Sequence, residues 1–152
     1  MASGTRANLD TSNLTISSLA RIDYGDLFTI PATVSETPEI WMRRIFGNKP
    51  NFFQKIIWTG LLGFSLSPTQ SPDTIAGWKI SGRGGDWIRI ENRSWFLEGN
   101  LICQTSKNSV SVFTLLQYRH WFGRCWWPMW SIVHRMIMPG LLGAAVRRTK
   151  VD

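Results

Sequence analysis

Three polar side chains in the C-terminal third of the chain have the types and positions that acid–base chemistry needs. A neutral imidazole both accepts and donates a proton near pH 7, and His134 lies at the edge of an apolar stretch with helical spacing. Tyr118 and His120 share the parity of the apolar residues before them, so one strand would direct both toward the interior. We predict His134, His120 and Tyr118 as catalytic residues at a cavity wall. The alternatives are a structural histidine bonded to the sheet and a half-exposed strand end.

The sequence is also rich in tryptophan, with 9 copies among 152 residues. Large aromatic side chains dominate protein cores and line ligand pockets. A tryptophan cluster near the histidine is therefore core, a stacking wall for a flat or cationic ligand, or an interfacial belt at a membrane. An arginine beside it would bind a carboxylate or phosphate, unless it is only solvated. The predicted ligand-binding residues are Trp126, Trp127, Trp130, Trp95, Arg119 and Tyr24.

The spacing of apolar residues predicts that an α+β domain positions these side chains. Residues 21–32 are expected to be extended. Two short helices should follow, over residues 38–46 and about 52–62, and the second is apolar nearly all round, which predicts burial. Between residues 78 and 120, alternating apolar residues separated by polar turns predict an antiparallel meander.

The C-terminal segment is expected to form a long helix that covers the apolar face of this meander. Pro128 suits a first helical turn, so the helix should begin near Trp127, and Pro139 should kink it. At about 100° per residue, Arg135 and Leu142 should point away from the sheet. The residues expected to face the sheet are Trp126, Met129, Trp130, Val133, Met136, Ile137, Gly140, Leu141 and Ala144.

This order of elements resembles the START-like or helix-grip fold, in which an antiparallel sheet wraps a long C-terminal helix and leaves an elongated cavity. Residues 21–148 would form this single ligand-pocket domain, and residues 1–20 a disordered polar tail. Cys103 and Cys125 lie among apolar residues, which predicts free, buried thiols. Because no signal peptide is visible, these thiols indicate a cytoplasmic protein.

The end of the chain resembles one known family. The segment Gly123-Arg124-Cys125-Trp126-Trp127, with His134 after it, is similar to the pattern Gly-x-x-aromatic-Trp, six residues, His. That pattern is typical of the uncharacterised bacterial family catalogued as domain of unknown function 2867, and the similarity runs from about Ile22 to Arg148. The chain departs from it at Ile132, where members often have proline, and at Arg119-His120, where His-Asn or Arg-Phe is common. The resemblance implies a helix-grip fold and no established chemistry.

The charge of the chain indicates the kind of partner. The formal net charge is +7, and no acidic residue lies between Gly99 and Val151. A field of one sign steers anionic partners, so we expect an apolar or anionic small-molecule ligand, with an acidic carrier protein as a further candidate. The basic residues are scattered and no nucleic-acid motif is present, which argues against nucleic acid. A homodimer is compatible with the sequence.

Contact with a membrane surface is a separate expectation from the apolar C-terminal segment. Residues 125–146 are long enough to span a bilayer. However, Arg135 in the middle and the two prolines disfavour a spanning helix. Attachment to the surface through tryptophan and arginine side chains is therefore expected instead.

Neither a metal nor a cofactor is expected. Asp23 and Asp26 are three residues apart, but a lone acidic pair is not a metal site. The glycine-rich segment at residues 82–85 matches no phosphate-binding loop and is expected to be a hairpin turn. The first hypothesis is a cofactor-independent cyclase or isomerase that acts on an apolar, cyclic or polyketide-like biosynthetic intermediate by shape and His/Tyr acid–base catalysis. The alternatives are a non-catalytic carrier or sensor of hydrophobic ligands and a module that binds a membrane or an acidic partner.

Overall fold

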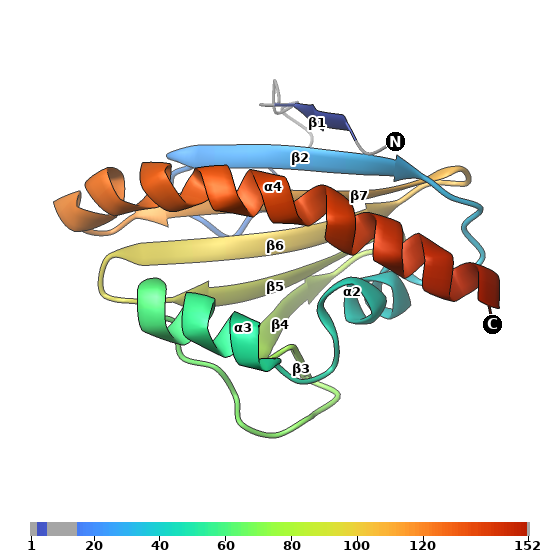
Figure 1. Ribbon diagram of the computed structural model, residues 1–152, viewed down its shortest axis with the longest axis horizontal. Helices are drawn as coiled ribbons and strands as arrows, with labels where there is room; N and C mark the ends of the chain where they lie inside the picture. The colour runs from blue at the N-terminus through green and yellow to red at the C-terminus, as the bar shows by residue number, and fades with distance from the viewer. Residues whose placement is uncertain (1–2, 6–14, 152) are drawn as a thin grey trace.

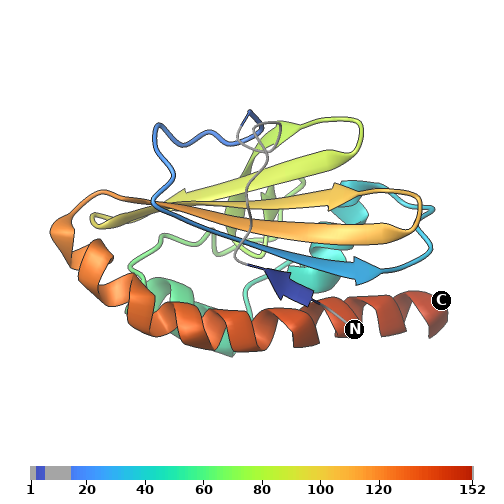
Figure 2. The ribbon, with the colours of Figure 1, turned by 90° about the horizontal axis from the view of Figure 1, so that it is seen from above.

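An antiparallel sheet and a long C-terminal helix form the two main layers of the molecule (Figures 1 and 2). The computed structural model describes residues 3–5 and 15–151. Within these residues, seven strands lie in the order β1-β2-β7-β6-β5-β4-β3. The strands are β1 (Ser3–Thr5), β2 (Tyr24–Pro31), β3 (Thr74–Ile75), β4 (Trp78–Arg83), β5 (Trp87–Arg93), β6 (Leu97–Thr105) and β7 (Ser109–Tyr118), and the helical elements are α2 (Pro38–Phe46), α3 (Phe52–Gln54), the π-helical segment η1 (Lys55–Leu61) and α4 (Trp121–Val151). The predicted α+β class, the meander, the turn after β4 and the long last helix are confirmed.

Strand β2 brings the start of the domain beside its last strand. It pairs antiparallel with β7, and this register sets Asp26 opposite Thr114. Side chains alternate along β2, so that Tyr24, Asp26, Phe28 and Ile30 are buried while the residues between them are partly exposed. The Asp26 carboxylate thus lies on the side of β2 that faces the core.

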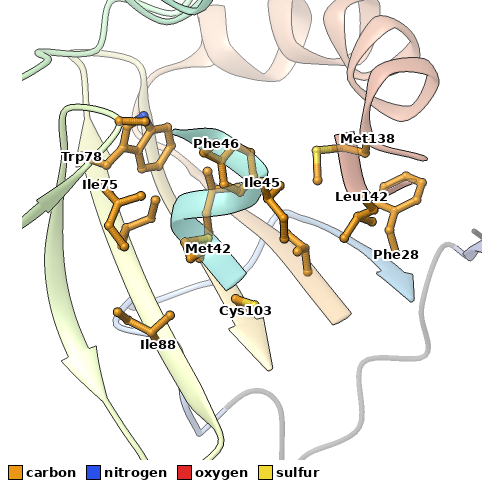
Figure 3. Close-up of a cluster of buried hydrophobic side chains, with 14 of the residues drawn as sticks. Phe28, Met42, Ile45, Phe46, Ile75, Trp78, Ile88, Cys103, Met138 and Leu142 are labelled. Carbon is orange, nitrogen blue, oxygen red and sulfur yellow. The ribbon is translucent and has the colours of Figure 1, made fainter. Parts of the chain in front are cut away.

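Helix α2 closes one end of the sheet. Its start follows from Thr37, whose hydroxyl accepts a hydrogen bond from the backbone N–H of Ile40, and from proline in the first turn. Gly47, with φ of 88°, ends it. Met42, Ile45 and Phe46 pack into the central core with Phe28 of β2, Trp78 of β4 and Met138 and Leu142 of α4, as Figure 3 shows.

The second predicted helix is present, but most of it is π-helical. Asn51 and Gln54 form a reciprocal capping box at its start, with bonds of 2.8 and 2.9 Å. After α3 the chain winds into η1, a rare geometry that often accompanies functional sites. The expected burial is wrong, because Phe52 and Phe53 are 72% and 73% exposed. The α3–η1 segment is apolar on all sides, but only one side of it can contact the core, so the apolar side chains on its other sides remain exposed.

Helix α4 begins six residues earlier than predicted, at Trp121, and both prolines lie inside it. Figure 2 shows that it bends near its start and then runs nearly straight. Pro139 belongs to the straight second half of the helix, so the predicted kink is wrong. The predicted orientation is right for Arg135, which is exposed, but wrong elsewhere, because Leu142 is buried whereas Met129 and Met136 are 59% and 75% exposed. Apolar residues occur on every side of this helix, so their spacing alone cannot select the buried side. The buried side carries Trp127, Ser131, Met138, Leu142 and Ala145.

The opposite face of the sheet is covered by the segment before β2. Ile16, Leu19 and Ile22 pack over a small cluster of β6 and β7 side chains. The hydroxyl of Ser17 and the backbone N–H of Ser18 each donate to Asn100 Oδ1 at 2.9 Å. The expected disordered tail is therefore wrong for residues 15–20 and for β1, and residues 1–2 and 6–14 lie outside the described chain.

The two cysteines differ in environment. Cys103 of β6 is fully buried, as predicted, whereas Cys125 of α4 is exposed. Cys125 lies on the outer side of α4. Its exposure could not be predicted, because the spacing of apolar residues does not show which side of α4 is buried. Burial raises the pKa of the Cys103 thiol to about 12.

Candidate functional site

A cavity of about 160 Å³ lies between α4, the α3–η1 segment and the sheet. Its position between the last helix and the sheet, and its apolar and aromatic walls, are as predicted. The only titratable side chain among its described lining residues is His134. The lining consists of Phe46, Gln54, Ile57, Trp58, Leu62, Phe64, Trp78, Leu101, Thr114, Leu116, Trp127, Trp130, Val133, His134, Ile137, Met138 and Leu141.

His134 is held in the cavity wall by two residues of the sheet. Its Nε2 lies 3.1 Å from Asp26 Oδ2 and 3.0 Å from Thr114 Oγ1. The β2–β7 register places these two partners directly opposite each other. His134 reaches them because it lies on the buried side of α4, two turns after Trp127, one turn after Ser131 and one turn before Met138.

The carboxylate that holds His134 is itself anchored from behind. Asp26 is only 1% exposed, and the Tyr24 hydroxyl donates to its Oδ2 at 2.7 Å. The other oxygen, Oδ1, has no hydrogen-bond partner among the described residues. A buried carboxylate is stable only when it is hydrogen-bonded or paired with a charge. Tyr24 and His134 therefore support the same oxygen, and each limits the movement of the other.

This arrangement selects a tautomer of the imidazole. An ionised carboxylate only accepts hydrogen bonds, so Nε2 carries the hydrogen that faces Asp26. Nδ1 then keeps its lone pair, and none of the hydrogen bonds of the described residues engages it. A histidine with one nitrogen fixed by a carboxylate and the other free is oriented as a general base, and the carboxylate stabilises the imidazolium that forms.

Aromatic rings pack closely around this polar cluster. Trp127 lies edge-on to Tyr24 at 5.3 Å and 5.6 Å from the His134 ring, measured between ring centroids. The indole N–H groups of Trp78, Trp127 and Trp130 are buried without a hydrogen-bond partner among the described residues. An unpaired buried donor costs about 1–3 kcal/mol. A ligand that brings an acceptor oxygen to one of these cavity-lining residues would recover part of that cost.

Four of the predicted site residues meet here. Trp127, Trp130 and His134 line the cavity, and Tyr24 stands behind His134 through Asp26. Trp126 is close by but has a different contact, since its indole N–H donates to the Leu61 carbonyl at 2.8 Å. That bond joins α4 to the end of η1.

The other four predicted residues lie away from the cavity. Tyr118 is not in the lining, and the Arg124 guanidinium lies 5.8 Å above its ring. His120 follows the end of β7 and is exposed, with its Nδ1 accepting from the backbone N–H of Phe122 at 3.2 Å. The shared parity failed because β7 ends at Tyr118, so that His120 lies in the bend between β7 and the start of α4 at Trp121.

Arg119 and Trp95 form part of the same corner of the molecule. The Arg119 guanidinium donates to the Ser94 carbonyl at 2.6 Å, so it supports a turn and has no place in the cavity wall. Trp95 is 61% exposed and stacks on Phe122 at 5.4 Å between centroids. Neither residue lines the cavity.

Sequence reasoning missed Asp26 and Thr114, the two residues that orient His134. The sequence does contain a signal for Asp26, because it is a charged residue between Tyr24 and Phe28 at alternate positions that otherwise carry apolar or aromatic side chains. Thr114 gives no such signal, since threonine is common in strands. The aromatic walls from Phe46, Trp58 and Trp78 were also not predicted, because they meet the cavity only after the elements pack.

Among residues 3–5 and 15–151, no group of three or more His, Cys, Asp or Glu side chains is arranged to hold an ion.

No family model matches the sequence, and neither a curated protein nor a solved structure shows significant similarity to it.

Proposed function

We propose that the protein binds a small, mostly apolar molecule in this cavity and moves a proton on it through His134. The observation that carries the proposal is the imidazole fixed by Asp26 and Thr114 in the wall of an otherwise apolar cavity. The proposal includes the helix-grip, START-like architecture and the relationship to domain of unknown function 2867. An antiparallel sheet under a long C-terminal helix and the Gly123 to His134 motif support both.

The size of the cavity limits the substrate. A cavity of about 150 Å³ holds a molecule such as benzene, and the cavity here measures about 160 Å³. One ring or a short chain therefore fits inside. A larger, polyketide-like molecule would have to extend outward between α3–η1 and α4, so a single-ring substrate is the better fit.

The chemistry that suits this site is isomerisation or cyclisation through a carbanion next to a carbonyl group. Nδ1 of His134 removes the proton of the C–H bond, and the electron pair of that bond forms the enolate. Asp26 stabilises the imidazolium that results. The imidazolium then returns the proton to another atom of the substrate, so that no oxidant, reductant or cofactor is consumed.

The second candidate is a carrier or sensor with the same cavity. It is supported by the lining, in which His134 is the sole titratable group of the described residues. An isomerase often uses a second acid–base group, and here a single histidine would have to perform both transfers. A carrier would use the same histidine only to hold a polar group of its ligand.

Hydrogen–deuterium exchange into cyclohexanone separates the two candidates. This ketone fits the cavity and has exchangeable hydrogens beside its carbonyl. In D₂O, we expect the protein to accelerate deuterium incorporation, and we expect His134→Gln to lose about 100-fold of that acceleration while still binding the ketone. A cavity-filling variant, Leu101→Trp, should lose binding and exchange together. Binding without accelerated exchange would support the carrier and contradict the enzyme.

A further inference from the structure

Eight of the eleven exposed large apolar side chains among the described residues lie on α3–η1 and the middle of α4. Phe52, Phe53 and Met136 are each more than 70% exposed. Along α4 the exposed residues recur at intervals of three and four, so they form one stripe. Met129, Ile132 and Met136 face away from the sheet, and Val133 and Ile137 lie on the edge of the stripe beside the cavity. We call the whole set the outer helical face: Phe52, Phe53, Ile56, Met129, Ile132, Val133, Met136 and Ile137.

The two parts of this face lie on the same side of the sheet. Figure 1 shows α3 and α4 both in front of the strands, and Figure 2 shows both below them. The hydrogen bond from Trp126 to the Leu61 carbonyl joins α4 to η1. Exposed apolar patches of this kind mark contact sites with partners or membranes.

The charge on these segments determines which partner fits. No acidic residue occurs between Ile40 and Pro72, or between Gly99 and Val151. Lys55, Arg135 and Arg147 are exposed on the two helical segments. A face with only positive charges repels a second copy of itself and attracts a negatively charged surface. Apolar and basic side chains together are typical of helices that lie in the headgroup region of a bilayer.

We propose that the outer helical face binds the surface of a bilayer that contains anionic lipids. In this position α4 lies parallel to the bilayer plane. By length and composition the segment Trp121–Thr149 could cross a membrane. However, Trp127, Met138 and Leu142 fix its other side to the core, and a spanning helix would have to give up those contacts.

The same position would connect the bilayer to the cavity, and this part of the inference rests on the proposed function. Val133 and Ile137 line the cavity and are also 39% and 41% exposed. The cavity wall is therefore one side chain thick on the outer helical face. An apolar molecule dissolved in the bilayer would reach the cavity by passing between α3–η1 and α4, without crossing water.

Sedimentation with lipid vesicles tests the proposal. The protein should bind vesicles of phosphatidylcholine with phosphatidylserine, and bind pure phosphatidylcholine vesicles on the order of tenfold more weakly or less. The double variant Phe53→Ser, Met136→Ser and the double variant Lys55→Glu, Arg147→Glu should each lose on the order of tenfold or more of the binding. The double variant Lys79→Glu, Lys107→Glu changes two exposed residues of β4 and the β6–β7 turn, so it is the matched charge control and should bind nearly as wild type. Thermal melts of each variant confirm folding.

Several results would overturn the proposal. The wild-type protein would fail to bind anionic vesicles, or the variants of the outer helical face would bind them as well as wild type does. Retention of the protein in the membrane after an alkaline carbonate wash would instead indicate a spanning helix. A stable dimer in light scattering that Met136→Ser disrupts would assign the face to a second copy instead. Deuterium exchange into soluble cyclohexanone needs no membrane, so failure of the vesicle test leaves the proposed function independently measurable.

Discussion

Replacing Gly123 by alanine should weaken the attachment of α4 to the sheet. A Cβ at this position would lie 2.5 Å from the Phe96 carbonyl oxygen, where ordinary contacts begin at 3.4 Å. The helix or the β5–β6 turn must therefore move by about 0.9 Å. Overpacking of this kind costs about 1–3 kcal/mol, partly offset by about 0.5–1 kcal/mol from the better helix propensity of alanine. We expect a net loss of up to about 2.5 kcal/mol.

Gly140 of the same helix provides a matched control. A Cβ there would meet no atom within 4 Å, so Gly140→Ala should gain only the propensity term, about 0.5–1 kcal/mol. In a chain of this size each kcal/mol changes the melting temperature by about 2–4 °C. Thermal and urea unfolding should therefore show Gly123→Ala below wild type and Gly140→Ala above it. Equal melting temperatures for the two variants would refute the close approach of α4 to Phe96.

Three further experiments test the burial of Cys103, the loss of stability at acidic pH and the hydrogen bond that joins α4 to η1. At pH 8, a maleimide should label Cys125 quickly and Cys103 only after denaturation, because Cys103 is buried and its pKa is raised to about 12; rapid labelling of both would place Cys103 at the surface. Burial raises the pKa of Asp23, but its hydrogen bonds to Arg21 and a backbone N–H outweigh this and hold the pKa below its usual value. Its stabilising effect should thus be complete above about pH 4 and lost at lower pH, and Asp23→Asn should flatten that part of the stability curve; an unchanged curve would contradict the pairing. Trp126→Phe keeps an aromatic ring but removes the indole N–H that donates to the Leu61 carbonyl, so it should speed amide hydrogen exchange in η1. Unchanged exchange would show that this hydrogen bond does not hold η1 in place.

The sequence was sufficient to predict most elements of the fold, for physical reasons, but not β1 or the π-helical geometry of η1. Alternation between residues 78 and 120 has a period of two, and the polar turns between its segments are short. Thr37-Pro38 and Asn51-Phe52 carry start signals for the two short helices. The orientation of α4 could not be predicted, since its apolar residues surround the whole helix. Pro128 was also misleading, because it is accommodated inside a helix that starts at Trp121.

The candidate site was only half visible in the sequence. His134 and its neighbouring tryptophans lie in one segment, where spacing reveals them. Asp26 and Thr114 are far apart in the chain and become partners of His134 only through the β2–β7 register. The prediction for His120 failed at an element boundary, the feature that local patterns determine least well. Tertiary pairing, which no local pattern records, decided which polar residues share a site.

Nitrogen NMR of His134 shows which ring nitrogen carries the hydrogen. The chain has only two histidines, so in His120→Gln every imidazole signal belongs to His134. We expect hydrogen on Nε2 and a lone pair on Nδ1. Phenol, a ring with one hydroxyl donor, should shift the Nδ1 signal saturably in His120→Gln but not when the folded, cavity-filling substitution Leu101→Trp is added. Hydrogen on Nδ1, or an Nδ1 signal that phenol leaves unchanged, would contradict the claim that Asp26 and Thr114 present this nitrogen to a ligand.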